Sequence, residues 1–462
     1  MSETQKKHFL PNRASYIRTV RLWLTAVLLF LPFQHITVTS LAAFNETLST
    51  CFNTLDEATV FFFFPLSLME LYRNRELNNR CYLVLFVPIF ILCASGLVSG
   101  VVNGNRLIVT ALGIIDYIKI FLFVFIYAAF FREIGEFRRV FNLLLIIAVV
   151  LGIVGFLQEI WALTMKYILE RDIYDKGNYL LGDIPVMLYR KVIIDHWRFG
   201  VFRAPSLVRN PNTLGFYALF IFTIYLSIKK KKNPVVFVSL LTGIIVSVSR
   251  KVYMELIFLT IVQAVKNRRR IAVPFIILTV MFFFIMSFTV DFNKWEFTVK
   301  GQYAELMSRK PYSKMISFRE YFKDKSMEIW KDHPYLGVGP GMFGGVVSIM
   351  YDSPVYDQYN VQKIAKALLT RWRDPHQFWP VLLAEMGILG VVSFVGLFAS
   401  LFFILFLLRK QAVSDEMKGL FTGLTVFTAI ILIHSFSSSI KEVIILMYFA
   451  LLGIGLGCTR KC

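Results

Sequence analysis

Residues 374–390 read DPHQFWPVLLAEMGILG. The stretch begins polar and bent by proline, places His376 near its start, and continues without a break into an apolar segment that runs to about residue 408. Some thirty apolar residues in a helix, at about 1.5 Å per residue, are more than enough to cross the ~30 Å hydrocarbon core of a bilayer. The stretch therefore predicts a membrane-spanning helix with an imidazole at its mouth.

The whole chain is far more apolar than a soluble protein. Of its 462 residues, 56% are hydrophobic and 46 are phenylalanine, a composition that a soluble domain does not tolerate. Runs of about 17 to 25 apolar residues, each long enough to cross a bilayer, recur along it. We therefore predict an all-α polytopic membrane protein with about twelve transmembrane helices. They fall roughly at residues 20–38, 55–72, 82–101, 107–131, 139–165, 211–228, 234–249, 251–265, 271–290, 378–408, 419–436 and 442–458.

Two polar stretches, residues 166–210 and 291–377, are long enough to hold structure of their own. An odd number of predicted spans precedes each of them, so both face the same side of the membrane. The connections on the other side carry clustered basic residues, including KKKK at 229–232 and KNRRR at 266–270. Because basic loops stay in the cytoplasm, we expect both termini to be cytoplasmic and both long loops to be outside.

This topology divides the chain into three parts. Residues 1–290 hold nine spans and the first outer loop, 166–210. Residues 291–377 form an extracytoplasmic helical cap, and residues 378–462 hold the last three spans. The net charge of +20 then mainly marks orientation, so nucleic acid is not an expected partner. Among the five cysteines only Cys51 is expected outside, which leaves no disulfide framework.

One charged feature stands out within the first five predicted spans. Asp116 and Lys119 lie in the sequence IIDYIKIF, and their spacing of three lets them meet on one helix face. A pair of opposite charges in hydrocarbon costs less than either ion alone. A structural ion pair is the favoured interpretation and a proton or ion relay is the alternative; a transporter would need more such groups.

The seventh and eighth predicted spans are unusually short. Only 32 residues lie between Asn233 and Lys266, so each arm of the hairpin has roughly 24 Å of helix, less than the ~30 Å of hydrocarbon. The tip, VSVSRKVYM at 246–254, should hold Arg250 and Lys251 at or slightly beneath the outer headgroups. A cation at that depth is costly without a partner. Anion binding by Arg250 is therefore favoured over simple snorkelling to the lipid surface.

Each outer loop carries a further arginine of interest. Arg203 lies just before a membrane span, in HWRFGVFRAPSLVRNPNTLG, where contact with lipid headgroups is an equally good interpretation. Arg319 lies in SKMISFREYFKDKSMEIWKDHP, which predicts an amphipathic helix that Pro334 ends; a solvated surface position is the alternative. The apolar stripe of this helix is formed by Met315, Phe318, Phe322 and Ile329.

A glycine-rich sequence, YLGVGPGMFGG at 335–345, follows the amphipathic helix. It resembles a phosphate-binding loop only superficially, because no strand-to-helix unit with a lysine follows it. Glycines also let one stretch of backbone approach another closely. We predict a tight turn of this second kind.

The predicted outer side lacks the motifs of several familiar sites. It has no HExxH, no CxxC, no Asp-x-Asp pair and no serine nucleophile elbow, so neither a metal nor a cofactor is expected. What remains is His376 together with arginines from three segments. Guanidinium groups bind phosphate in a bidentate way and keep their charge, and an imidazole can accept a proton from a hydroxyl. The set suits transfer from a membrane-anchored pyrophosphate donor, although a lone histidine here more often only caps a helix or faces headgroups.

The same residues resemble the O-antigen ligase and polymerase family of bacterial membrane glycosyltransferases. The resemblance consists of a short hairpin with a Ser-Arg tip, an amphipathic outer helix, HPYLGVGPG at 333–341, and a histidine that opens a helix containing Glu385. The ligase pattern of His, then Asn, Ser or Gln, nine residues, Gly, two residues and Gly is met by His376, Gln377, Gly387 and Gly390.

The resemblance implies a site and its substrates. The donor would be a glycan on undecaprenyl pyrophosphate, and the acceptor a hydroxyl of a glycan or of lipid A core. The reaction would invert the anomeric centre without a metal, at the outer face of the bacterial inner membrane, among lipids and other membrane proteins of polysaccharide assembly. By position, Arg203, Arg250 and Arg319 match the pyrophosphate-binding arginines and His376 the proposed base. The supporting positions are Gln377, Glu385 and Gly387.

Two questions stay open at this point. A ligase attaches finished glycan to its acceptor, whereas a polymerase joins repeat units. The polymerase branch is associated with an arginine followed by ten residues and then a glycine, but here eleven residues lie between Arg203 and Gly215. A flippase or other transporter of lipid-linked oligosaccharide is the rival from another class, and it would require charged residues through several spans.

Overall fold

The computed structural model is almost entirely helical, which confirms the predicted all-α class. Two short strands, β1 and β2, pair antiparallel, with Trp197 opposite Phe202. The structure describes residues 13–42, 44–77, 79–175, 197–198, 201–208, 210–228, 232–266, 318–361, 377–440 and 442–459. The elements are α1 (Arg13–Phe30), η2 (Leu31–Phe33), α2 (Gln34–Ala42), α3 (Glu46–Asn53), α4 (Leu55–Arg73), α5 (Arg80–Val102), α6 (Leu107–Phe130), α7 (Ile134–Asp175), β1 (Trp197–Arg198), β2 (Val201–Phe202), η5 (Ser206–Val208), α9 (Pro211–Ile228), α10 (Pro234–Val246), α11 (Arg250–Lys266), α14 (Phe318–Asp332), α15 (Val346–Met350), α16 (Val355–Gln358), α18 (Phe378–Gln411), α19 (Asp415–Ser435) and α20 (Val443–Cys458).

Seven helices of the described chain are long and apolar enough to cross a membrane. The apolar helices α10 and α20 are shorter, and α4 and α11 also coincide with predicted spans. The ninth predicted span, 271–290, lies outside the described residues, so the total of twelve stays a prediction. The seven long helices are Arg13–Ala42, Arg80–Val102, Leu107–Phe130, Ile134–Ala162, Pro211–Ile228, Phe378–Gln411 and Asp415–Ser435.

Helix α7 differs from its prediction. We expected a span at 139–165 followed by an outer loop, but α7 has 42 residues and continues to Asp175. At about 1.5 Å per residue it is roughly 63 Å long, about twice what the hydrocarbon core requires. The start of the predicted outer loop is therefore a helical extension, because a polar, charged sequence can continue a helix beyond the membrane as readily as it can end one.

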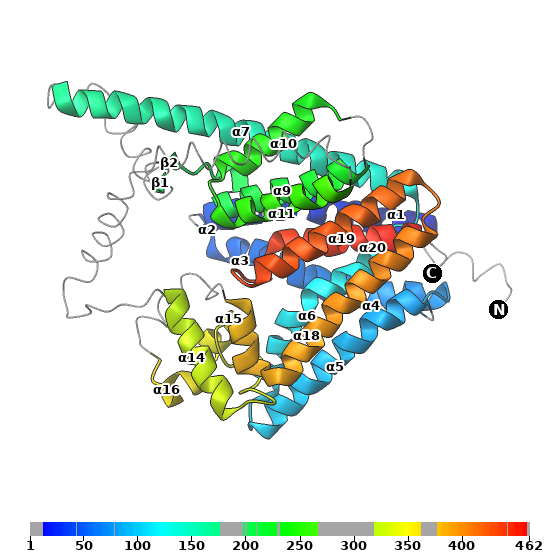
Figure 1. The fold of residues 1–462 in the computed structure, drawn as a ribbon. Coiled ribbons are helices and arrows are strands. Elements are labelled where there is room, and N and C mark those ends of the chain that lie inside the picture. Colours follow the sequence, from blue (N-terminus) through cyan, green and yellow to red (C-terminus); the bar gives the residue numbers. More distant parts are fainter. Residues whose placement is uncertain are drawn as a thin grey trace.

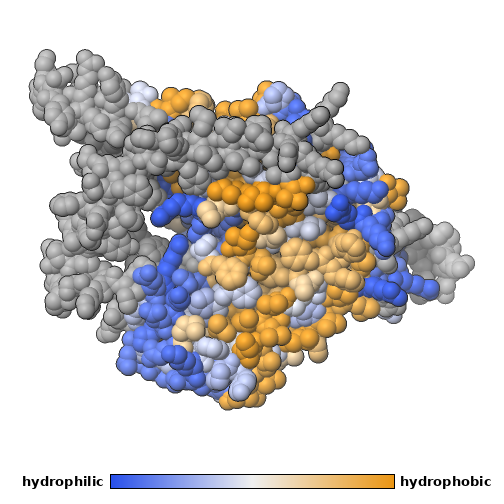
Figure 2. All heavy atoms as spheres, viewed as in Figure 1, coloured by the Kyte–Doolittle hydropathy of each residue, from blue (hydrophilic) through white to orange (hydrophobic). Residues whose placement is uncertain are grey.

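The surface has the hydropathy pattern of a membrane protein. Figure 2 shows a broad hydrophobic area across the helices, with hydrophilic residues to its left and a second hydrophilic area at the right. Large apolar side chains are exposed on several helices, among them Phe61 of α4, Phe90 of α5 and Phe406 of α18. Large exposed apolar side chains are unfavourable in water, but they are normal on the lipid-facing surface of a membrane-spanning helix.

The first and last described helices share one end of the molecule. Arg13 at the start of α1 pairs with Glu70 near the end of α4. Arg21 donates from Nε to the carbonyl of Phe130, the last residue of α6, at 2.5 Å. Gly457, near the end of α20, packs against the backbone at the end of α6. This end lies at the right of Figure 1, whereas α14, α15 and α16 lie at the lower left.

Helix α6 occupies the centre of the bundle. It packs against α4, α5 and α20, and every residue from Ile120 to Phe130 is buried. Such a helix can be apolar on all sides because none of its faces meets water or lipid headgroups. The buried hydroxyl of Tyr127 has a hydrogen-bond partner within this core, because it donates to the carbonyl of Leu24 at 2.7 Å.

Candidate functional site

The hairpin of α10 and α11 has the short geometry predicted from the sequence. Helix α10 has 13 residues, about 20 Å of rise against the ~30 Å of hydrocarbon. The side chain of Asn233 caps its start by accepting from the amide of Val235. Ser247 and Ser249 in the turn between the helices, residues 247–249, are buried. Arg250, whose side chain is exposed, is the first residue of α11, so the turn delivers it to the end of the hairpin.

Arg203 is brought to the same turn by the chain that follows β2. The amide of Ala204 donates to the carbonyl of Val246, the last residue of α10, at 2.9 Å. The Arg203 guanidinium donates from Nε to the carbonyl of Ser247 at 3.3 Å and from Nη2 to Asn212 Oδ1 at 2.6 Å. Two of the three predicted arginines thus come from different segments and meet at one hairpin turn.

Helix α18 begins where the sequence predicted, at Phe378. Gln377 stands at its N-cap position, and its side chain makes no capping hydrogen bond there. Trp379, the second residue of α18, donates from its indole nitrogen to Ser435 Oγ of α19 at 2.8 Å. His376, the predicted base, lies outside the described residues, so its role stays a prediction.

The glycine loop, residues 335–345, lies against a break in α18. Gly387 has φ +59° and ψ −160°, which interrupts the helix. The carbonyls of Ala384 and Glu385 accept from the amides of Val338 and Gly339 of the loop at 2.9 and 2.8 Å. Non-helical backbone in a membrane helix is tolerated where other protein groups satisfy it. The predicted close approach of backbone is therefore confirmed, and its partner is the break in α18.

Glu385 fastens this contact with its side chain. The buried carboxylate accepts from the Tyr117 hydroxyl at 2.6 Å and from the amide of Phe343 at 2.8 Å. Tyr117 belongs to α6 and Phe343 to the glycine loop, so one side chain joins the central helix, the loop and α18. Glu385 and Gly387 thus shape the break in α18, and the supporting role in the reaction predicted for them stays a prediction.

We expect Tyr117→Phe to lower the free energy of unfolding by about 1 kcal/mol, because it removes one hydrogen bond to a buried carboxylate and leaves Phe343 as a donor. Thermal unfolding of the purified protein in detergent would measure the change. Tyr72→Phe is the matched control, because Tyr72 is an exposed tyrosine on α4. Equal unfolding temperatures for the two variants would contradict the role given to the Tyr117 hydroxyl.

The described part of the cap, residues 318–361, contains the predicted amphipathic helix as α14. Phe322 and Ile329, on the apolar face of α14, are buried. Phe322 packs on Phe343 with ring centroids 5.6 Å apart. Arg319 is exposed on α14, which packs against α18. Figure 1 shows α14 apart from α10 and α11. Within the described part of the chain, Arg319 therefore lies on the cap, apart from Arg203 and Arg250 at the hairpin turn.

A tyrosine completes the cap core. The Tyr356 hydroxyl accepts from the amide of Gly344 at 3.1 Å and shares a hydrogen bond with Ser348 Oγ at 2.7 Å. Burial raises the pKa of Tyr356 to about 12, so the hydroxyl stays neutral near pH 7. The glycine loop is thus held by the cap on one side and by α18 on the other.

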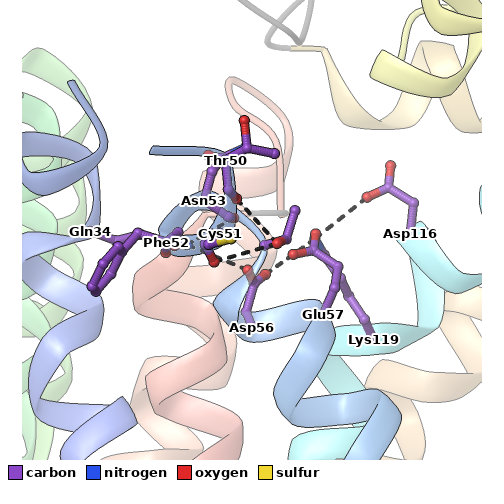
Figure 3. A network of polar contacts seen from close by, with 10 residues as sticks. Gln34, Thr50, Cys51, Phe52, Asn53, Asp56, Glu57, Asp116 and Lys119 are labelled. Carbon is purple, nitrogen blue, oxygen red and sulfur yellow. Dashed lines mark hydrogen bonds and ion pairs between the residues drawn. The ribbon is translucent and has the colours of Figure 1, made fainter. Parts of the chain in front are cut away.

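The charged pair predicted in α6 belongs to a larger cluster. Figure 3 shows Lys119 between Asp116 and the start of α4. Its Nζ lies 2.5 Å from Glu57 Oε1, 3.2 Å from Asp56 Oδ2 and 3.8 Å from Asp116 Oδ1. Gln34 lies 3.4 Å from Asp56 Oδ1. The pair exists as predicted, but the nearer partners of Lys119 come from α4, so Asp116 and Lys119 are not the only charged groups of these helices.

Asp116→Asn should change the free energy of unfolding by less than about 1 kcal/mol, because Lys119 keeps two closer carboxylates and the Asp116 side chain is 28% exposed. Chemical denaturation in detergent would measure this, with Asp352→Asn on the cap surface as the control. If Asp116 were instead part of a proton relay, the protein would stay stable and lose its activity.

A second charged cluster has no counterpart in the sequence predictions. His434 of α19 hydrogen bonds to Glu255 of α11 and to Glu442, just before α20. An ionisable residue inside an apolar segment by itself indicates either a functional role or a buried partner. Glu255 and His434 are both such residues, so the sequence could have indicated them. Within the part of the chain that the structure describes, no group of three or more His, Cys, Asp or Glu side chains could hold a metal ion.

Comparison with known families gives one match. Residues 235–395 match the family model described as O-antigen ligase. The matched segment spans the α10–α11 hairpin, the described cap and the first half of α18. No curated protein matches the chain.

Proposed function

We propose that this protein transfers a glycan from undecaprenyl pyrophosphate to a hydroxyl of an acceptor glycan or of lipid A core, since residues 235–395 match the family model described as O-antigen ligase, the family that the sequence resembles. The family implies a membrane glycosyltransferase of O-antigen assembly with a lipid-linked donor. The observation that carries the finer proposal is the hydrogen bond from Arg203 to the hairpin turn that directly precedes Arg250.

The hairpin turn has the properties of a pyrophosphate site. Arg250 starts α11, and the first amides of a helix carry partial positive charge that favours an anion. Arg203 adds a second guanidinium, held in place by Asn212. Guanidinium groups stay charged and bind phosphate in a planar, bidentate way. These groups would stabilise the negative charge that develops on the leaving pyrophosphate, an effect that often dominates catalysis.

In the proposed reaction, the acceptor hydroxyl attacks the anomeric carbon of the donor and its proton passes to His376. The bond between that carbon and the pyrophosphate oxygen breaks, and undecaprenyl pyrophosphate leaves with the electron pair. Attack opposite the leaving group inverts the anomeric centre. Arg319 would approach the pyrophosphate from the cap. Because arginines supply the positive charge, the proposal requires no metal and no cofactor.

The direct test uses purified protein in lipid vesicles with a glycan on undecaprenyl pyrophosphate and a soluble or lipid-linked acceptor. We expect glycan transfer in the presence of EDTA, and absence of any transfer from intact wild-type protein would reject the proposal. A deletion strain then separates the two branches. Unattached long chains in the strain indicate a ligase, whereas acceptors carrying single repeat units indicate a polymerase.

A transporter of lipid-linked oligosaccharide is the second candidate, because the structure holds more buried charge than the sequence suggested. The Lys119 cluster and the Glu255–His434–Glu442 cluster both lie within or at the start of apolar helices. Their members pair with one another, which favours structural roles over a path for substrate. Movement of labelled lipid-linked glycan across the vesicle membrane, without transfer to an acceptor, would support the transporter instead.

A further inference from the structure

His434 is held on both sides by carboxylates. Its Nδ1 lies 2.6 Å from Glu255 Oε1, and its Nε2 lies 3.1 Å from Glu442 Oε1. The side chains of His434 and Glu255 are only 3% and 1% exposed, whereas that of Glu442 is 27% exposed. We call these three residues the imidazole bridge. None of them was assigned a part in the reaction above.

When both carboxylates are ionised, the ring must donate a hydrogen bond from each nitrogen. An ionised carboxylate only accepts, and a neutral imidazole has one N–H and one acceptor nitrogen. Two ionised carboxylates on the two nitrogens are therefore satisfied together only by the imidazolium. Glu442 also accepts from Ser438 Oγ at 2.9 Å. Lys251 lies one helical turn before Glu255 on α11. The positive charges of Lys251 and the imidazolium therefore balance the negative charges of Glu255 and Glu442.

The bridge connects α11, which carries Arg250, with α9, whose Asn212 holds the Arg203 guanidinium. Glu255 lies five residues after Arg250 on α11, and the His434 ring stacks on Phe216 of α9 with centroids 4.2 Å apart and planes 18° apart. Phe216 lies one turn after Asn212, which holds the Arg203 guanidinium. One side of α9 therefore touches both Arg203 and the bridge, while α11 carries both Arg250 and the bridge.

We infer that the Glu255–His434–Glu442 bridge positions the pyrophosphate arginines by locking the start of α11 against α9 and α19. This inference rests on the proposed function, because it assumes that Arg203 and Arg250 bind the pyrophosphate. His434 is a positioning residue: it acts through α11 and α9 and does not touch the substrate. A charged, two-sided clamp suits this task, since breaking a buried ionic contact is costly and the geometry is thereby held.

The test measures binding of inorganic pyrophosphate to the purified protein in detergent by titration calorimetry. His434→Gln keeps a polar side chain but cannot donate to both carboxylates, and we expect it to raise the Kd about tenfold. In protein that already carries Arg250→Gln, the same change should raise the Kd only about threefold, because the part of its effect that passes through α11 to Arg250 is absent and the part that passes through α9 to Arg203 remains. With Arg409→Gln, on an exposed residue in the last turn of α18, the full tenfold effect should remain.

Several outcomes would overturn the inference. An unchanged Kd in His434→Gln rejects it, and so does an equal effect of His434→Gln with and without Arg250→Gln, which would indicate a general loss of structure. Glu442→Gln serves if His434→Gln does not fold, because it keeps the Glu255 contact; a Kd raised about threefold supports the inference and an unchanged Kd rejects it. If the wild-type protein binds no pyrophosphate, the proposed function fails first and the inference falls with it.

Discussion

Gly387→Ala is expected to lower the free energy of unfolding by about 2–4 kcal/mol and to detach the glycine loop from α18. Gly387 has φ +59° and ψ −160°, a combination essentially restricted to glycine. An added Cβ would also lie 2.4 Å from the carbonyl carbon and oxygen of Tyr335. These atoms are backbone, so they cannot rotate away, and either α18 or the loop must move.

Two measurements would record the effect. Thermal unfolding in detergent reports the loss of stability, and limited proteolysis reports release of the loop, with new cleavage expected within residues 335–345. Transfer activity should fall as well, because the α18 mouth carries the predicted base.

Gly396→Ala is the matched control in the same helix. An added Cβ at Gly396 meets only Pro88 Cβ at 3.9 Å, which is ordinary contact, and alanine favours a helix over glycine by about 1 kcal/mol. This variant should be as stable as the wild type or slightly more so. Equal stability of Gly387→Ala and Gly396→Ala would show that the break in α18 is not needed to seat the loop.

The parts of the fold that could be predicted from the sequence depend on neighbouring residues. The shortness of the α10–α11 hairpin follows from the number of residues between Asn233 and Lys266, and the amphipathic character of α14 follows from the spacing of Phe322 and Ile329. The glycine loop could be predicted as a place of close approach, because glycine is permissive wherever it occurs. These are properties of single segments.

The parts that could not be predicted depend on distant residues. The partner of the glycine loop is about fifty residues away, at Glu385 and Gly387, and the loop sequence does not encode it. The carboxylate of Glu255 and the ring of His434 are separated by 179 residues. Asp56 and Glu57 fall within the predicted span at 55–72, and their pairing with Lys119 arises only when α4 packs on α6. Ionisable residues in apolar segments thus predicted pairing in general but not the partners.

Arg250→Gln should lower the initial rate of glycan transfer about 10²- to 10³-fold while the protein remains folded in the membrane. The magnitude is that typical of removing one preorganised group that stabilises charge in a transition state. Stability should change little, because the Arg250 side chain is exposed at the start of α11 and surface substitutions usually cost less than about 0.5 kcal/mol. A large loss of rate with little loss of stability is the behaviour of a binding residue.

Arg250→Lys separates charge from geometry at the same position. Lysine keeps the positive charge but cannot form the planar, bidentate contact, so a loss of about tenfold is expected if the guanidinium binds phosphate. Arg409→Gln, at the far end of α18, should change the rate less than twofold. Rates are measured in vesicles with lipid-linked donor, together with protein quantity and unfolding temperature for each variant. If Arg250→Gln retained more than a third of the wild-type rate, the role of Arg250 in binding the pyrophosphate would be rejected.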